Sequence, residues 1–160
     1  MKKLVLLFIV IFQLLSCNSN KKGETVQAPL ETLDNENTES ILGKVTVYEG
    51  VLPCADCEGS ETVLKIYQGD GTIESHKFEL TSIYKGKKPE KKFVEKGNYN
   101  LERGLEKDPD GTIYVLNYDK SQAGQIYYGY TAKTPDKIFL LDNNREKIKS
   151  KLNYFLTLKE

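Results

Sequence analysis

Hydrophobic and polar residues alternate with a period of two along most of the chain from about Ile41 onward. Because successive side chains of a strand point to opposite faces, this alternation is typical of half-buried β-strands. The pattern predicts eight strands, at Lys44–Tyr48, Thr62–Tyr67, Thr72–Tyr84, Phe93–Leu101, Thr112–Tyr118, Ile126–Thr131, Lys137–Leu141 and Asn153–Leu158.

The segments between these strands carry turn chemistry, and no convincing amphipathic helix separates them. Gln68–Gly71 has an Asp-Gly pair, in which glycine supplies the positive φ of a hairpin turn. Further turns are predicted at Gly86–Pro89, Asp108–Gly111, Ser121–Gly124 and Thr134–Asp136. Short strands joined by tight turns indicate an all-β antiparallel meander. About eight strands are enough to close such a sheet into a β-barrel.

The N-terminus has the features of a bacterial export signal. Two lysines precede the apolar run Leu4–Leu15, which would span about 18 Å as a helix and is too short for a ~30 Å bilayer core. Leu14-Leu15-Ser16-Cys17 then resembles a lipobox, the sequence at which lipoproteins are acylated and cleaved. We therefore expect residues 1–16 to be a lipoprotein signal peptide, and Cys17 to become the lipid-carrying N-terminus of the mature protein.

The following residues are too polar to form a core. Asn18–Ser40 is rich in acidic side chains and its few apolar residues show no sustained period. Such a segment cannot bury enough surface to offset its loss of chain entropy. We expect residues 17–41 to be a lipid-anchored flexible tether and residues 42–160 to be the β-barrel domain.

Charge and composition exclude several functional classes. The 23 basic and 23 acidic residues give zero net charge, which argues against binding to nucleic acid. His76 is the only histidine, so a metal centre built from several histidines is excluded, and we interpret it as a solvent-facing strand residue. No catalytic constellation appears among the scattered carboxylates. We therefore expect a protein that is not an enzyme.

A short segment with two cysteines interrupts the strand pattern. Cys54 and Cys57 are separated by two residues, a spacing that suits a tight disulfide or two thiolate ligands for one soft metal ion such as copper(I). A four-ligand zinc site lacks its second pair of ligands. A thioredoxin-like role is disfavoured, because Pro53 precedes the pair and the strand at Thr62–Tyr67 follows it. Both the disulfide and the metal site stay open from the residues alone.

The second feature outside the strand pattern is the run Lys85–Lys92, with five lysines and one glutamate. We interpret it as a solvated hairpin tip, with contact to anionic lipid or to a partner as the alternative.

The segment Gly50–Gly59, followed by Glu61-Thr62, resembles the signature of the N-terminal domain of the NlpE copper-resistance lipoproteins. Weaker similarities follow in the same order at Gly97-Asn98-Tyr99 and at Leu140-Leu141-Asp142. The resemblance covers residues ~43–158 and implies a lipocalin-like β-barrel on an outer-membrane lipoprotein.

By that resemblance, the protein would contribute to copper tolerance and to envelope-stress sensing through a signalling partner. Its lipid anchor would be at Cys17, and Cys54 with Cys57 would form the copper(I) site.

A second function from another class remains open. The barrel could carry a small apolar ligand, and the disulfide would then be purely structural. An interior cavity would favour this carrier, whereas a barrel filled with tyrosine, leucine and phenylalanine side chains would exclude it.

Overall fold

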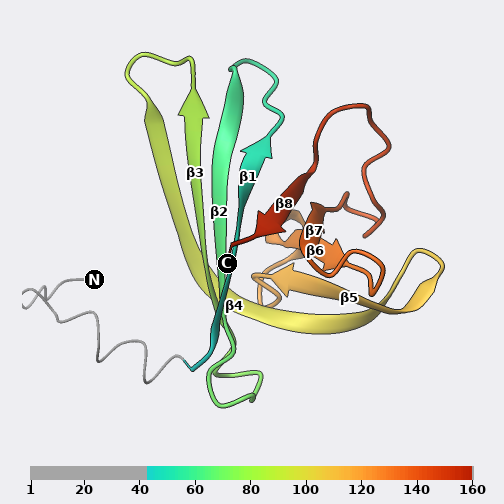
Figure 1. Cartoon of the computed structure of the whole chain (residues 1–160). Coiled ribbons are helices and arrows are strands. Elements are labelled where there is room, and N and C mark those ends of the chain that lie inside the picture. The colour runs from blue at the N-terminus through green and yellow to red at the C-terminus, as the bar shows by residue number, and fades with distance from the viewer. Residues whose placement is uncertain (1–42, 160) are drawn as a thin grey trace, which may run out of the picture. The chain divides into compact units, whose positions relative to one another are not determined.

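The computed structural model describes residues 43–159, which form a closed antiparallel β-barrel and one 3₁₀ turn, η1 (Gln122–Gly124) (Figure 1). The predicted all-β barrel of eight strands is therefore confirmed. The expected signal peptide, tether and lipidation at Cys17 lie outside the described residues. The strands are β1 (Val45–Leu52), β2 (Gly59–Tyr67), β3 (Lys77–Lys85), β4 (Lys91–Leu105), β5 (Asp108–Leu116), β6 (Ile126–Tyr130), β7 (Lys137–Leu140) and β8 (Phe155–Leu158).

The barrel is a meander in which each strand pairs with the next strand along the chain. Closure comes from β8, which pairs with the middle of β1 through Tyr48↔Leu158 and Glu49↔Thr157. The upper parts of β1 to β4 rise beyond this closure as a four-stranded sheet, and the loops at its end lie side by side at the top of Figure 1.

Every strand contributes at least one side chain to the main core cluster. Alternation along each strand sends these side chains to the same side of the sheet, which is the barrel interior. Burial raises the pKa of the Tyr99 hydroxyl to about 12 and also raises that of Tyr114. The cluster consists of Tyr48, Leu52, Leu64, Ile66, Phe78, Leu80, Tyr99, Tyr114, Leu116, Tyr128, Ile138 and Leu156.

A second, smaller cluster lies on the outer face of β5. Ile113 and Val115 alternate with the interior residues of that strand and pack with Tyr127. The guanidinium of Arg145 lies 5.2 Å from the centre of the Tyr127 ring and donates to Glu102 at 2.6 Å. The loop between β7 and β8 thus covers part of the outer wall.

One strand begins later than predicted, because local side-chain hydrogen bonds compete with strand pairing. Asp70 accepts from the backbone and the hydroxyl of Thr72 at 2.9 and 2.7 Å, and the Ser75 hydroxyl donates to the Thr72 carbonyl at 2.8 Å. Residues 72–76 therefore form turns, and β3 starts only at Lys77. The prediction of a strand from Thr72 was therefore wrong over residues 72–76. The turn predicted at Gln68–Gly71 is present, and the Gly71 N–H donates to the Gln68 carbonyl at 3.0 Å.

The turn predicted at Asp108–Gly111 was also wrong. These residues belong to β5, and the chain reverses instead at Glu106, which adopts a φ of 55°. A register shift between Arg103 and Leu105 accompanies this reversal. As a result β4 is fifteen residues long, and it pairs with β3 along its first part and with β5 along its last part.

Candidate functional site at the cysteine loop

The cysteine loop, residues 53–58, connects the upper ends of β1 and β2. Pro53 has no backbone N–H to continue the ladder, so β1 ends at Leu52. Gly59 begins β2 with a φ of 151°, and a Cβ atom there would lie 2.7 Å from Cγ1 of Val51. This tight connection requires glycine and fixes where the loop rejoins the sheet.

Cys54 and Cys57 form a disulfide within this loop, with their Cα atoms 5.3 Å apart. Both residues are half-buried, and neither belongs to a core cluster. The sulfur of Cys54 lies 3.7 Å from Oδ1 of Asp56, and that of Cys57 lies 3.4 Å from the Gly59 carbonyl oxygen. The structure thus brings together the two sulfurs singled out from the sequence, and it contains their disulfide form.

The loop also contacts the turn between β3 and β4. The Lys87 ammonium forms an ion pair with the Asp56 carboxylate, and its hydrogen bond holds the pKa of that carboxyl below its usual range. The backbone N–H of Glu58 donates to the Lys85 carbonyl at 3.1 Å. Sequence reasoning identified the basic run but not this contact, since the partners are 31 residues apart.

A hollow of about 260 Å³ opens beside this contact, lined by Asp56, Tyr84, Lys87, Lys91 and Phe93. The Tyr84 and Phe93 rings meet edge to face, with their centres 5.4 Å apart. The hollow therefore combines two ammonium groups with aromatic side chains next to the disulfide.

Within residues 43–159, no three or more histidine, cysteine, aspartate or glutamate side chains are grouped so that they could hold a metal ion. At the cysteine loop, the sulfur donors are Cys54 and Cys57. A pair of thiolates suits copper(I), which accepts two soft sulfur ligands, and does not complete a tetrahedral zinc site. The donor set fits copper(I) once the disulfide is reduced.

His76 does not face solvent from a strand as predicted. It is half-buried just before β3, and its ring stacks on that of Tyr99 with the centres 4.5 Å apart. It lies at the opposite end of β2 from the cysteine loop. The structure therefore does not bring the single histidine to the two sulfurs.

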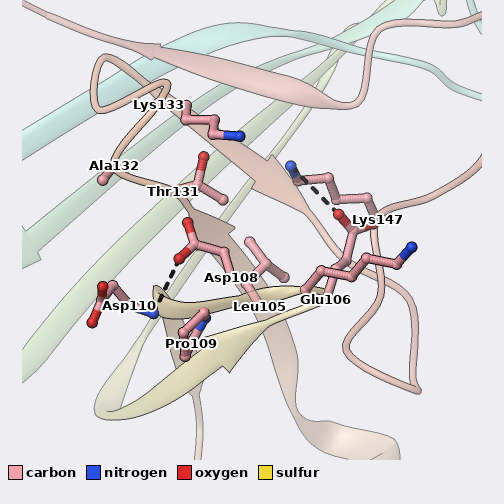
Figure 2. A pocket seen from close by; sticks show the side chains of 10 residues that line it. Leu105, Glu106, Asp108, Pro109, Asp110, Thr131, Ala132, Lys133 and Lys147 are labelled. Atoms are coloured by element: carbon pink, nitrogen blue, oxygen red, sulfur yellow. Dashed lines mark hydrogen bonds and ion pairs between the residues drawn. The ribbon is translucent and has the colours of Figure 1, made fainter.

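Another pocket, of about 420 Å³, lies at the hairpin between β4 and β5 and contains none of the site residues predicted from the sequence (Figure 2). Two contacts lie at its rim: the backbone N–H of Asp110 donates to the Asp108 carboxylate at 3.0 Å, and the Lys147 ammonium lies 3.7 Å from the Glu106 carboxylate. No helix among the described residues is long and apolar enough to cross a membrane.

Comparison with known families agrees with this geometry. The family model of the NlpE N-terminal domain matches residues 48–151, well over half of the chain. The chain belongs to the NlpE family. The match contains the cysteine loop and the barrel strands up to β7.

Two solved structures are similar to this chain. One is a protein of Shewanella oneidensis assigned as a lipoprotein, with 28% identity and a TM-score of 0.51 over 78% of this chain and 94% of that one. The other is the Cpx pathway activator NlpE of Escherichia coli, with 27% identity and a TM-score of 0.43 over 72% of this chain and 50% of that one. A search of curated proteins found no match. Family and homologues together indicate a bacterial envelope lipoprotein of the NlpE type.

Proposed function

We propose that this protein is an outer-membrane lipoprotein, anchored through Cys17, whose cysteine loop binds copper(I) when reduced and forms a disulfide when oxidised. In this proposal it contributes to copper tolerance and reports envelope stress to a signalling partner. It has no catalytic activity of its own. The observation that carries the proposal is the pairing of Cys54 and Cys57 in a loop outside both core clusters.

The position of the loop allows its chemistry to change without unfolding the barrel. The bridge closes a segment of only four residues, and β1 and β2 are held together by a continuous register from Val45↔Tyr67 to Leu52↔Ser60. Opening the bridge therefore leaves the sheet paired up to the last residue before the loop. A site of this kind can alternate between oxidised and reduced forms.

The metal step has a defined proton balance. A dithiol reductant first converts the bridge to two thiols, and is itself oxidised to a disulfide. Binding of copper(I) by both sulfurs then releases one proton from each thiol. Affinity therefore rises with pH below the usual thiol pKa of about 8.5, by up to roughly a hundredfold per pH unit.

The carrier alternative receives less support from the fold. Side chains from all eight strands pack into the main core cluster, and among these Leu64, Leu116 and Leu156 are fully buried. These side chains occupy the barrel interior, where a carried ligand would have to lie. Tyrosine, leucine and phenylalanine dominate the cluster, which is the filling that argues against a carrier.

A competition titration tests the copper proposal. The processed chain, residues 17–160, would carry Cys17→Ser, so that Cys54 and Cys57 are its only thiols. Reduced protein, oxidised protein and a further Cys54→Ser/Cys57→Ser variant would each be titrated against a coloured copper(I) chelate. We expect only the reduced protein to remove copper from the chelate. Equal competition by all three forms would contradict the proposal and leave the disulfide as a structural bridge.

The anchor is tested separately in cells. Cys17→Ala should release the protein from the membrane fraction or leave an uncleaved precursor, because the variant offers no acylation site at the expected position. If the variant is processed and stays in the outer membrane as the wild type does, the anchor at Cys17 is wrong.

A further inference from the structure

The turn between β3 and β4 carries a local excess of positive charge, although the net charge of the whole chain is zero. Residues 85–92 contain five lysines and one glutamate, whereas the whole chain has zero net charge. Lys85 and Lys87 are paired with Glu61 and Asp56. Within the described part of the chain, the ammonium groups of the other three lysines, Lys88, Lys91 and Lys92, have no carboxylate within 4.0 Å. Their charge is free to act on a partner.

Exposed apolar side chains gather at the same end of the barrel. Phe93 and Val94 directly follow the lysines and are 54% and 49% exposed. Val51, 51% exposed, lies one residue before the end of β1, whose loop to β2 contacts the turn between β3 and β4. The Asn153 side-chain amide donates to the Val51 carbonyl at 3.3 Å, which brings Leu152, 62% exposed, to this end as well. Four of the seven exposed large hydrophobic residues among positions 43–159 thus lie here.

The first residues of β4 are accessible from the side. Pairing of β4 with β5 begins only at Tyr99↔Leu116, so Lys91 to Lys96 pair with β3 alone. The hollow lined by Lys87, Lys91, Tyr84, Phe93 and the carboxylate of Asp56 opens at the same place. Lys91 and Phe93 lie on one face of β4, and Lys92 and Val94 lie on the other, so both faces meet at this open strand edge. The turn that precedes it is at the top left of Figure 1.

We propose that this surface, which consists of Lys88, Lys91, Lys92, Phe93 and Val94 and is called here the basic edge, binds the anionic phospholipid surface of a membrane. Lysines next to an aromatic side chain match an interface in which phosphates lie just above acyl chains. Phe93 and Val94 would enter the headgroup region, and the hollow at Lys87 and Lys91 would receive a lipid phosphate. This binding does not depend on the copper chemistry.

The length of the chain before the barrel permits this orientation. The 27 residues from Cys17 to Gly43 can reach at most about 90 Å when extended. That exceeds the length of the eight-residue strand β1, about 27 Å, which separates the start of the barrel from the basic edge. A chain anchored at Cys17 could therefore place the basic edge on the same membrane.

Vesicle flotation tests the proposal, with the processed chain carrying Cys17→Ser so that no lipid is attached. We expect binding to phosphatidylcholine vesicles that contain one third phosphatidylglycerol, no binding to phosphatidylcholine alone, and loss of binding at high salt. Lys91→Gln/Lys92→Gln should weaken binding roughly 25-fold, because each basic side chain near an anionic surface contributes a factor of about five. Phe93→Ser should weaken it further by several-fold.

Two variants distinguish specific binding through the basic edge from non-specific electrostatic attraction between lysines and the vesicle. Asp56→Asn removes the carboxylate that neutralises Lys87, and should strengthen binding about fivefold. Lys107→Gln/Lys133→Gln removes two exposed lysines at the pocket of Figure 2, near the other end of β4, and should leave binding unchanged. Circular dichroism would confirm that each variant is folded.

Three results would overturn the proposal. The first is equal binding to neutral and anionic vesicles, and the second is equal losses in the basic-edge and control variants. The third is self-association without lipid that Phe93→Ser abolishes, because it would make this surface an interface between copies of the chain.

Discussion

Removing the disulfide should cost little stability, even though it is the only covalent cross-link among residues 43–159. In the chain-entropy description, closing a loop of four residues lowers the entropy of the unfolded chain by about 6 cal/mol/K, or about 2 kcal/mol at 25 °C. Cys54→Ser/Cys57→Ser leaves no cavity, because neither residue belongs to a core cluster. We therefore expect a loss of about 2 kcal/mol and a Tm lower by about 5–10 °C.

Urea unfolding followed by circular dichroism measures this loss. The midpoint should fall while the slope m stays constant, since the surface exposed on unfolding is unchanged. Reduced wild type should behave as the double variant does, and the matched core variant Leu64→Ala should lose more, about 2–5 kcal/mol. A loss above about 4 kcal/mol in the cysteine variant, or a changed m, would refute the reasoning and make the bridge part of the fold.

Three further predictions concern the barrel itself. Gly97→Ala should destabilise the protein by about 1–3 kcal/mol in the same urea assay, because its Cβ would lie 2.6 Å from Oδ1 of Asn117; no loss would contradict this close packing. The nearby Ser75 hydroxyl and the hydrogen bonds from Thr72 lower the pKa of Asp70 to about 2, so its stabilising effect should be complete above about pH 5 and lost as pH falls through about 2; an NMR titration with an ordinary pKa would refute it. Burial raises the pKa of Tyr99 to about 12, so the free energy of unfolding should decline as pH rises from 10 through about 12. The phenolate absorbance of Tyr99 should appear only near pH 12, and its appearance at pH 10 would refute the burial argument.

The fold could be predicted from the sequence where the signal was local and repeated along the chain. Period-two alternation located all eight strands, because each strand has one face in the main core cluster. Boundaries failed where side chains competed with the ladder, as the Asp70 hydrogen bonds do before β3. They failed again at Asp108–Gly111, where turn-forming residues sit inside β5 because the reversal occurs at Glu106.

The sequence identified the two cysteines of the candidate site, but not the side chains that surround them. The spacing of Cys54 and Cys57 placed both sulfurs in one loop, which the structure bears out with a disulfide. Lys87 and Tyr84 come from the neighbouring hairpin, and only the registers of β1 with β2 and of β2 with β3 bring them to the loop. Register between hairpins depends on long-range packing, so local patterns carry no signal for it.

The continuous register between β1 and β2 has a consequence for how this family can diversify. Since Leu52↔Ser60 is already paired below the cysteine loop, residues can be exchanged or inserted above it without moving any interior side chain to the wrong face. New donor sets could thus be selected, or grafted by design, on an unchanged barrel. The loop would then serve as a replaceable module, in which histidine, methionine or carboxylate ligands could be introduced for other metal ions.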